Sequence, residues 1–174
     1  MIHYLRGDAT LPLLTEPNKN AIICHCCNNV NAWGAGFVIA LNRRFGNVAE
    51  IDFHKMNQVL GNISVVKVLE ENGKTVAVCN IIGQEGVHSH TSRTFKYDPK
   101  VLGMNLVENV TPPVRYWAIE EGLRRLRKKI GDRTDIAIHM PRMGCGLAGG
   151  EWSKIEAVIR RTINDLDVYV YDFD

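Results

Sequence analysis

Two glycine-rich segments contain the residues best suited to hold an anionic ligand. The first glycine segment spans residues 28–36 and the second spans residues 141–150, and each lies between an apolar stretch and an amphipathic one. Glycine lets a backbone approach a ligand closely, and the free N–H groups at a helix start bind anions. Two such segments side by side would hold a diphosphate. Either one alone is equally compatible with a tight turn between a strand and a helix.

The second glycine segment also fits the dinucleotide pattern G-x-G-x-x-G, from Gly144 to Gly149. That pattern is informative when it opens a β-α-β unit with an acidic residue about 20 positions further on. Here only one strand is expected to follow, and Asp165 and Asp167 precede it. A nicotinamide oxidoreductase is therefore disfavoured, and the sequence has no G-x-x-x-x-G-K-[ST] motif.

The run Cys24-His25-Cys26-Cys27 brings three thiols and an imidazole together. Neighbouring residues of a strand point to opposite faces, and no second ligand pair has zinc spacing, so no metal site is expected. No cysteine has an arginine six positions after it, which argues against a phosphatase with a cysteine nucleophile. The five cysteines are interpreted as reduced thiols, because three of them crowd within four positions.

The composition favours small-molecule chemistry. The chain has 174 residues, which suits one domain, and its 21 basic and 19 acidic residues give a net charge of +2. This balance is too even for a surface that coats nucleic acid. No membrane-spanning stretch and no signal peptide are recognisable, so a cytosolic protein without membrane contact is expected.

Hydrophobic periodicity predicts strands that alternate with helices, which implies an α/β fold with helices on both faces of a mixed or parallel sheet. Asn72-Gly73 predicts a hairpin turn between two of the strands. The predicted strands are Ile2–Leu5, Ala21–Cys27, Ile63–Leu69, Thr75–Ile82, Asp135–Met140 and Val168–Tyr171. The predicted helices are Phe37–Phe45, Val48–Gln58, Tyr116–Ile130 and Glu151–Leu166.

A long segment with weak periodicity, Gly83–Pro113, separates the two halves of the chain and is interpreted as a functional loop or lid. In the helix that follows, apolar residues recur at steps of three and four. The charged residues of its other face, which include Arg124, Arg127 and Lys128, are assigned to solvent.

Three motifs in this order resemble those of a macrodomain. They are Gly7-Asp8-Ala9-Thr10, then His25-Cys26-Cys27-Asn28 leading into Trp33-Gly34-Ala35-Gly36, and Pro141 to Trp152. The similarity is to the branch that contains ADP-ribose-1″-phosphate phosphatases and terminal ADP-ribose protein glycohydrolases, and it covers nearly the whole chain. It implies a three-layer α/β/α macrodomain with a mixed central sheet over residues 1–174, which binds ADP-ribose at the carboxyl ends of the central strands.

The resemblance also implies a role for individual residues. Asp8, beside Ala9, would accept a hydrogen bond from the adenine amino group, and Tyr171 and Phe173 would pack against the adenine ring. Asn28 and Asn31 would bind the hydroxyls of the distal ribose. The diphosphate would be held by the backbone of the two glycine segments, namely Trp33, Gly34, Ala35, Gly36, Gly144, Cys145, Gly146, Leu147, Ala148 and Gly149.

The chain departs from the glycohydrolase branch at two places. That branch carries a lysine just after the strand that corresponds to Thr75–Ile82 and an aspartate in the second glycine segment, where this chain has Gly83-Gln84 and Ala148. The second glycine segment is more similar to that of the phosphatase-type and of phage or bacterial members, in which Gln84 and the pair Arg115-Tyr116 also recur.

The resemblance therefore predicts a hydrolase of ADP-ribose derivatives, with removal of the 1″-phosphate from ADP-ribose-1″-phosphate as the leading reaction. His25 is the candidate general base, because an ordinary histidine pKa of about 6.5 suits proton transfer near neutrality. Gln84 and Arg115 complete the predicted catalytic group, with Arg115 against the phosphate. The expected partner is ADP-ribose or a derivative, without cofactor or metal, and the protein is expected to be a monomer. Two alternatives stay open: removal of ADP-ribose from protein or nucleic acid, and a module that binds ADP-ribose without turnover.

Overall fold

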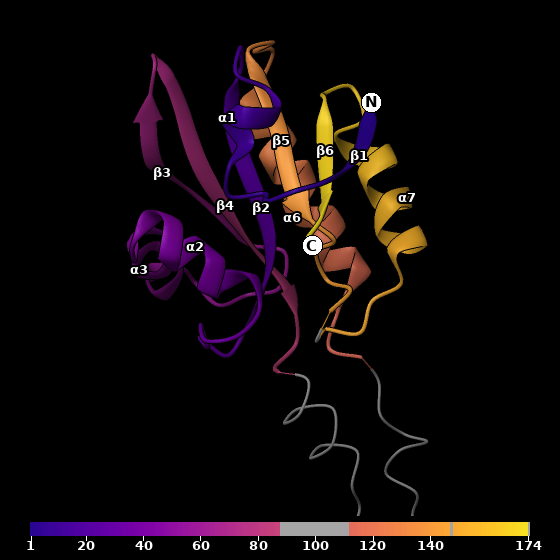
Figure 1. The fold of residues 1–174 in the computed structure, drawn as a ribbon. Helices are drawn as coiled ribbons and strands as arrows, with labels where there is room; N and C mark the ends of the chain where they lie inside the picture. Colours follow the sequence, from indigo (N-terminus) through magenta and orange to yellow (C-terminus); the bar gives the residue numbers. More distant parts are fainter. Residues whose placement is uncertain (88–111, 147, 174) are drawn as a thin grey trace, which may run out of the picture.

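The computed structural model describes residues 1–87, 112–146 and 148–173, and a six-stranded mixed sheet forms its centre (Figure 1). The strand order is β1-β6-β5-β2-β4-β3; neighbouring strands run parallel except β3, which pairs antiparallel with β4. The strands are β1 (Ile2–Arg6), β2 (Asn20–Asn28), β3 (Ile63–Glu71), β4 (Lys74–Gln84), β5 (Ile136–Pro141) and β6 (Val168–Asp172).

Helices cover both faces of this sheet, which confirms the predicted α/β/α architecture. The described helices are α1 (Pro12–Thr15), α2 (Phe37–Phe45), α3 (Val48–Lys55), α6 (Tyr116–Ile130) and α7 (Trp152–Thr162). Alternate residues of β2 point to opposite layers: Ile22 and Cys24 pack in the core that includes α6 and α7, whereas Ala21 and Ile23 pack with residues of α2 and α3. None of the described helices is both long and apolar enough to cross a membrane.

The predicted hairpin turn and the predicted bounds of two helices are confirmed. Asn72 and Gly73 form the two-residue turn between β3 and β4, with φ angles of 53° and 76°. Both values are positive, as the favoured hairpin turns require. α2 and α6 have the predicted bounds, and each ends at a glycine with positive φ, Gly46 or Gly131.

Two predicted helix ends were wrong, and one short helix was not predicted. α3 ends at Lys55 instead of Gln58, because the Gln58 side chain donates to the carbonyl of Phe53 and Met56 has an extended conformation. α7 spans Trp152–Thr162 instead of Glu151–Leu166, although Leu166 is buried. The four-residue helix α1 was not predicted, since one turn gives no periodicity to recognise.

The topology brings the ends of four strands to one edge of the sheet. β2, β4, β5 and β6 are parallel, so the segments that follow them meet at their carboxyl ends. In open α/β sheets this is the edge where ligands bind. Most of the predicted lid falls on residues 88–111, which lie outside the described residues.

Candidate functional site

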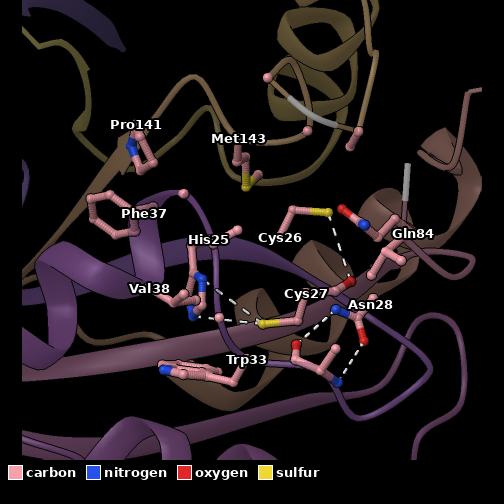
Figure 2. Close-up of a pocket in the computed structure, with 18 of the residues that line it drawn as sticks. His25, Cys26, Cys27, Asn28, Trp33, Phe37, Val38, Gln84, Pro141 and Met143 are labelled. Atoms are coloured by element: carbon pink, nitrogen blue, oxygen red, sulfur yellow. Dashed lines mark hydrogen bonds between the residues drawn. The ribbon is translucent and has the colours of Figure 1, made fainter. Parts of the chain in front are cut away.

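A cavity of about 470 Å³ lies at the carboxyl ends of β2 and β5, between the two glycine segments (Figure 2). Its volume is within the usual range of small-molecule sites, which is about 300–1,000 Å³. Figure 2 shows Cys26 and Gln84 on one side of the cavity and Phe37 and Pro141 on the other. The walls therefore come from β2, β4, the start of α2 and the end of β5.

Asn28 shapes the first glycine segment with its side chain. Its Oδ1 atom accepts hydrogen bonds from the backbone N–H groups of Val30 and Ala32, and its Nδ2 atom donates to the carbonyl of Ala32 over 2.8 Å. Asn28 is 8 % exposed and lines the cavity. Because these bonds occupy most of its polar capacity, its observed role is to fold the loop.

The first glycine segment leaves a row of backbone donors beside the cavity. Within the described residues, the N–H groups of Gly34, Ala35, Gly36, Phe37 and Val38 have no backbone or side-chain acceptor. Gly36 precedes α2 with φ at 73°, a left-handed conformation that favours glycine. All five residues line the cavity, so this row meets the requirement for an anion site at a helix start.

The second glycine segment curls into a tight loop on the opposite wall. The N–H of Gly150 donates to the carbonyl of Gly144 over 2.7 Å, and Gly144 has φ at 77°. A Cβ atom on Gly144 would lie 3.2 Å from Val114 and 3.3 Å from Ile119, so the loop packs closely on the start of α6. Gly144, Gly146 and Ala148 line the cavity.

His25 lies in the cavity wall but is only 2 % exposed. Its Nε2 atom is 2.5 Å from Oδ1 of Asn80, and its ring meets that of Trp33 edge-on with centroids 5.4 Å apart. Burial lowers the pKa of His25 to about 4, against the hydrogen bond to Asn80, which raises it. The imidazole is therefore neutral near pH 7.

The thiols of the wall are not available as thiolates. Burial raises the pKa of Cys26 to about 12 and raises the pKa of Cys27 well above its ordinary value. All five cysteines are free in the structure, as the sequence analysis assumed. Gln84 also lines the cavity, and its Nε2 atom donates to the carbonyl of Gly86.

The structure brings ten of the predicted site residues together in the cavity wall, which are His25, Asn28, Trp33, Gly34, Ala35, Gly36, Gln84, Gly144, Gly146 and Ala148. Leu147 lies outside the described residues. The remaining predicted residues are not part of the wall, and they are Asp8, Ala9, Asn31, Arg115, Cys145, Gly149, Tyr171 and Phe173.

Two of these residues have side chains that bond to groups outside the cavity. The Arg115 guanidinium donates to the carbonyls of Pro112, Pro113 and Val114 and pairs with Glu85 at 2.8 Å. These contacts hold the chain before α6 in place, and the predicted contact of Arg115 with a phosphate stays a prediction. Asn31 points its Oδ1 atom at His54 on α3, 2.7 Å from Nδ1, and its predicted contact with the distal ribose stays a prediction.

The residues expected at the adenine end form a neighbouring group. Pro141 of the cavity wall is the register partner of Tyr171 on β6, and a Cβ atom on Gly7 would lie 3.6 Å from the Tyr171 ring. Tyr171 is 4 % exposed and its hydroxyl donates to Thr15, whereas Phe173 is 79 % exposed. Asp8 accepts from the N–H and hydroxyl of Thr10 through Oδ1, and its Oδ2 atom is 3.6 Å from Arg44.

Sequence reasoning missed nine residues of the wall. Six of them lie inside the motifs and glycine segments named above but were not assigned to the site, namely Cys26, Cys27, Ala32, Pro141, Arg142 and Met143. Phe37 and Val38 directly follow the first glycine segment, and Val87 lies three positions after Gln84. Arg142 is the charged residue in this set, and it forms a two-point ion pair with Asp172 at 2.6 and 3.1 Å.

Solved structures with the same fold cover almost the whole chain. A protein of unknown function from Bacteroides thetaiotaomicron is 31 % identical with a TM-score of 0.76, and the match covers 99 % of this chain and 98 % of that one. A macrodomain protein from Streptomyces coelicolor is 31 % identical with a TM-score of 0.70, and the match covers 99 % of each chain. Thermosipho africanus DarTG in complex with ADP-ribose shares the fold at 16 % identity, with a TM-score of 0.65 over 99 % of this chain and 41 % of that one.

Curated relatives are more distant in sequence. ADP-ribose 1″-phosphate phosphatase from Scheffersomyces stipitis is 24 % identical over 98 % of this chain and 99 % of its own length. Bovine ADP-ribose glycohydrolase OARD1 is 22 % identical over 97 % of this chain and 88 % of its own length. Mouse chromodomain-helicase-DNA-binding protein 1-like is 25 % identical over 99 % of this chain, which spans only 18 % of that protein. No protein-family model matches the chain.

Proposed function

Since the chain belongs to the macrodomain family, we propose that it binds ADP-ribose and hydrolyses an ADP-ribose derivative, with ADP-ribose-1″-phosphate as the leading substrate. The proposal treats residues 1–174 as one macrodomain, monomeric and cytosolic, without a cofactor. The phosphatase assignment is supported by the yeast relative, which aligns along its full length.

The observation that carries the proposal is the pair of glycine segments on opposite walls of one cavity. The first presents the N–H groups of Gly34 to Val38, and the second brings Gly144, Gly146 and Ala148 to the same space. Backbone donors of this kind bind phosphate oxygens without a cluster of lysine or arginine. A diphosphate between them would leave the adenine toward Pro141 and Tyr171 and the distal ribose toward Asn28 and Gln84.

His25 is the proposed general base. Among the described side chains of the cavity wall, the titratable ones are His25, Cys26, Cys27 and Arg142, and the thiols and the guanidinium hold their protons near neutrality. In the proposed step, His25 takes a proton from water as that water attacks phosphorus, and the bond from phosphorus to the 1″-oxygen breaks. The 1″-oxygen leaves as a hydroxyl with a proton from solvent, and His25 then returns its own proton to solvent. A base whose pKa is about 4 removes protons weakly, so the proposal expects slow turnover.

Two other functions of the same cavity remain as alternatives. The glycohydrolase relatives support removal of ADP-ribose from a macromolecule. The low basicity and 2 % exposure of His25 instead favour a module that binds ADP-ribose without turnover. All three functions bind ADP-ribose or its derivatives in the same cavity. They differ in whether the protein releases phosphate, releases ADP-ribose or releases nothing.

One turnover assay separates the three functions. The purified protein is incubated with ADP-ribose-1″-phosphate and, in parallel, with a mono-ADP-ribosylated protein, in water enriched in ¹⁸O. The phosphatase proposal expects labelled inorganic phosphate from the first substrate. Release of ADP-ribose from the second alone would assign the glycohydrolase reaction, and binding without any product would assign the non-catalytic module.

A further inference from the structure

Arg142 lies in the cavity wall, but its guanidinium is bound by a residue of β6. Nε of Arg142 donates to Oδ1 of Asp172 over 2.6 Å, and Nη2 donates to Oδ2 over 3.1 Å. Asp172 ends β6 and lies outside the described wall of the cavity. A planar guanidinium that uses two donors on one carboxylate has a fixed orientation. The ion pair therefore determines where the Arg142 side chain lies.

Two aromatic rings flank the same guanidinium. Its central carbon is 5.2 Å from the centroid of the Tyr4 ring and 5.3 Å from that of the Trp152 ring. The two rings meet nearly edge-on, at 81°, and Nε1 of Trp152 donates to the Tyr4 hydroxyl over 2.9 Å. Tyr4 belongs to β1 and Trp152 begins α7. Since a cation within about 6 Å of a ring is attracted to it, residues of β1, β6 and α7 together hold one guanidinium.

These contacts tie the two ends of the second glycine segment together. Arg142 is the second residue of that segment, and Trp152 follows its last residue by two positions. Inside the segment, the N–H of Gly150 donates to the carbonyl of Gly144 over 2.7 Å. Gly146 lies between these contacts and lines the cavity. The placement of Gly146 therefore depends on where the ends of the segment are held.

Asp172 also holds the chain at the end of the site that is expected to bind adenine. Its backbone carbonyl accepts from the N–H of Gly7 over 2.9 Å, and Gly7 directly precedes Asp8. The side chain of Asp172 thus binds the segment proposed to hold the diphosphate, and its backbone binds the segment proposed to hold the adenine. One residue connects two parts of the candidate site that are far apart in the sequence.

We propose that Arg142 is a positioning residue, whose ion pair with Asp172 sets the second glycine segment relative to the adenine end of the site. This inference rests on the proposed function, because the benefit is measured as ADP-ribose affinity. ADP-ribose would span both parts, so a displaced segment would meet the diphosphate less well while the adenine stays bound. The two side chains are 37 % and 48 % exposed, so we expect the loss of this ion pair to weaken binding by about three- to fivefold.

The test is a double-mutant cycle in calorimetric titrations with ADP-ribose, with thermal melts to check that each variant is folded. Asp172→Asn keeps the size of the side chain and the backbone carbonyl that binds Gly7, but it removes the charge. We expect Asp172→Asn and Arg142→Gln to weaken binding by similar factors. The double variant should bind no more weakly than the weaker single variant, because both changes remove one interaction. Asp172→Glu keeps a carboxylate and should bind more tightly than Asp172→Asn.

Arg127→Gln is the matched control. Arg127 makes a two-point ion pair with Asp165 through the same two nitrogens, at 3.2 and 2.7 Å, in another part of the fold, so this variant should bind like the wild type. Wild-type affinity in Asp172→Asn would overturn the proposal, and it would assign a loss in Arg142→Gln to direct contact with the ligand. Losses that multiply in the double variant would also overturn it, because they would show two independent effects.

A ligand-free measurement separates this inference from the proposed function. In NMR spectra of the free protein, the amide N–H of Gly146 should shift in Asp172→Asn, although Asp172 lies on β6, and it should not shift in Arg127→Gln. If ADP-ribose fails to bind the wild type but the Gly146 signal shifts, the proposed ligand is wrong and the positioning role stands. An unshifted Gly146 signal in Asp172→Asn would overturn the positioning role whether or not ADP-ribose binds.

Discussion

Nε2 of His25 lies 2.5 Å from Oδ1 of Asn80, and the two side chains are 2 % and 0 % exposed. Asn80 uses its Nδ2 atom to donate to the carbonyl of Ala49 and to Ser64, which fixes Oδ1 as the atom that faces the histidine. An amide oxygen only accepts, so Nε2 of His25 carries the proton and Nδ1 keeps its lone pair. The cavity wall thus holds a neutral imidazole in one tautomer.

Acid should destabilise the protein before its carboxylates titrate. Burial lowers the pKa of His25 to about 4 and that of His139 to about 3, below the ordinary value of about 6.5 in an unfolded chain. The unfolded state then binds more protons, so the free energy of unfolding is greatest above pH ~6.5 and falls as the pH drops toward 4. Each histidine contributes up to about 1.4 kcal/mol per pH unit in that window.

Urea denaturation between about pH 7.5 and 5 measures this loss. His139→Gln should reduce the slope of unfolding free energy against pH, and His3→Gln, a half-exposed control, should not reduce it. Stability independent of pH across this window would contradict the burial of neutral histidines.

Removing His25 should affect turnover more than binding. If His25 activates the attacking water, His25→Ala should lower kcat for ADP-ribose-1″-phosphate by ~10²–10⁴-fold while the Kd for ADP-ribose changes little. Single-turnover phosphate release and calorimetry give the two values. A kcat unchanged from wild type would assign His25 to the packing of Trp33 alone.

Gly34 and Gly146 should tolerate a side chain structurally, but ADP-ribose binding should not. A Cβ atom at Gly34 or Gly146 meets no heavy atom within 4 Å, so Gly34→Val and Gly146→Val should fold. Their side chains would enter the space of the diphosphate, and we expect ADP-ribose affinity to fall by ~10-fold or more. Binding and circular dichroism are measured together.

Two kinds of control variant are compared with Gly34→Val and Gly146→Val. Arg124→Gln and Lys128→Gln remove exposed charges of α6 and should leave affinity unchanged. Gly150→Ala would place a Cβ atom 2.4 Å from the carbonyl oxygen of Gly144, so it should disturb the fold itself. Equal losses of affinity from the charge variants and the glycine variants would indicate an electrostatic surface instead of a backbone site.

We expect Asn28 to affect ADP-ribose affinity through the shape of the first glycine segment. Asn28→Ala removes the acceptor of the Val30 and Ala32 N–H groups and the donor to the Ala32 carbonyl. We expect weaker ADP-ribose binding with a small change in melting temperature, because the lost bonds organise a surface loop. Undiminished affinity in this variant would show that the loop keeps its shape without the asparagine side chain.

Local signals explain why much of the fold was predictable. The Asn72-Gly73 turn, the apolar spacing in α6 and the glycines after α2 and α6 each act within a few residues, so the sequence displays them directly. The helix end at Lys55 was not visible, because it depends on a side chain of Gln58 that also bonds to Asn31, 27 positions away.

The cavity wall was predictable where glycines form it. Gly34 and Gly146 are marked by their residue type, and the wall contains both. The contacts of Arg115 and Asn31 could not be predicted from the sequence, because a polar side chain near a site can bond to several neighbours and tertiary contacts decide among them. The sequence shows which polar groups are present, whereas the packing of α3 and of the chain before α6 decides where they point.

The most direct test of the central claim is a calorimetric titration of the wild-type protein and Gly146→Val with ADP-ribose, with thermal melts of both at increasing ligand concentration. We expect saturable one-site binding to the wild type, a melting temperature that rises with ligand, and a stabilisation of about 2.7 kcal/mol when free ligand is a hundredfold above Kd. Gly146→Val should melt like the wild type without ligand and show a much smaller ligand-induced rise. Absence of both heat and melting shift for the wild type at millimolar ADP-ribose would contradict the account.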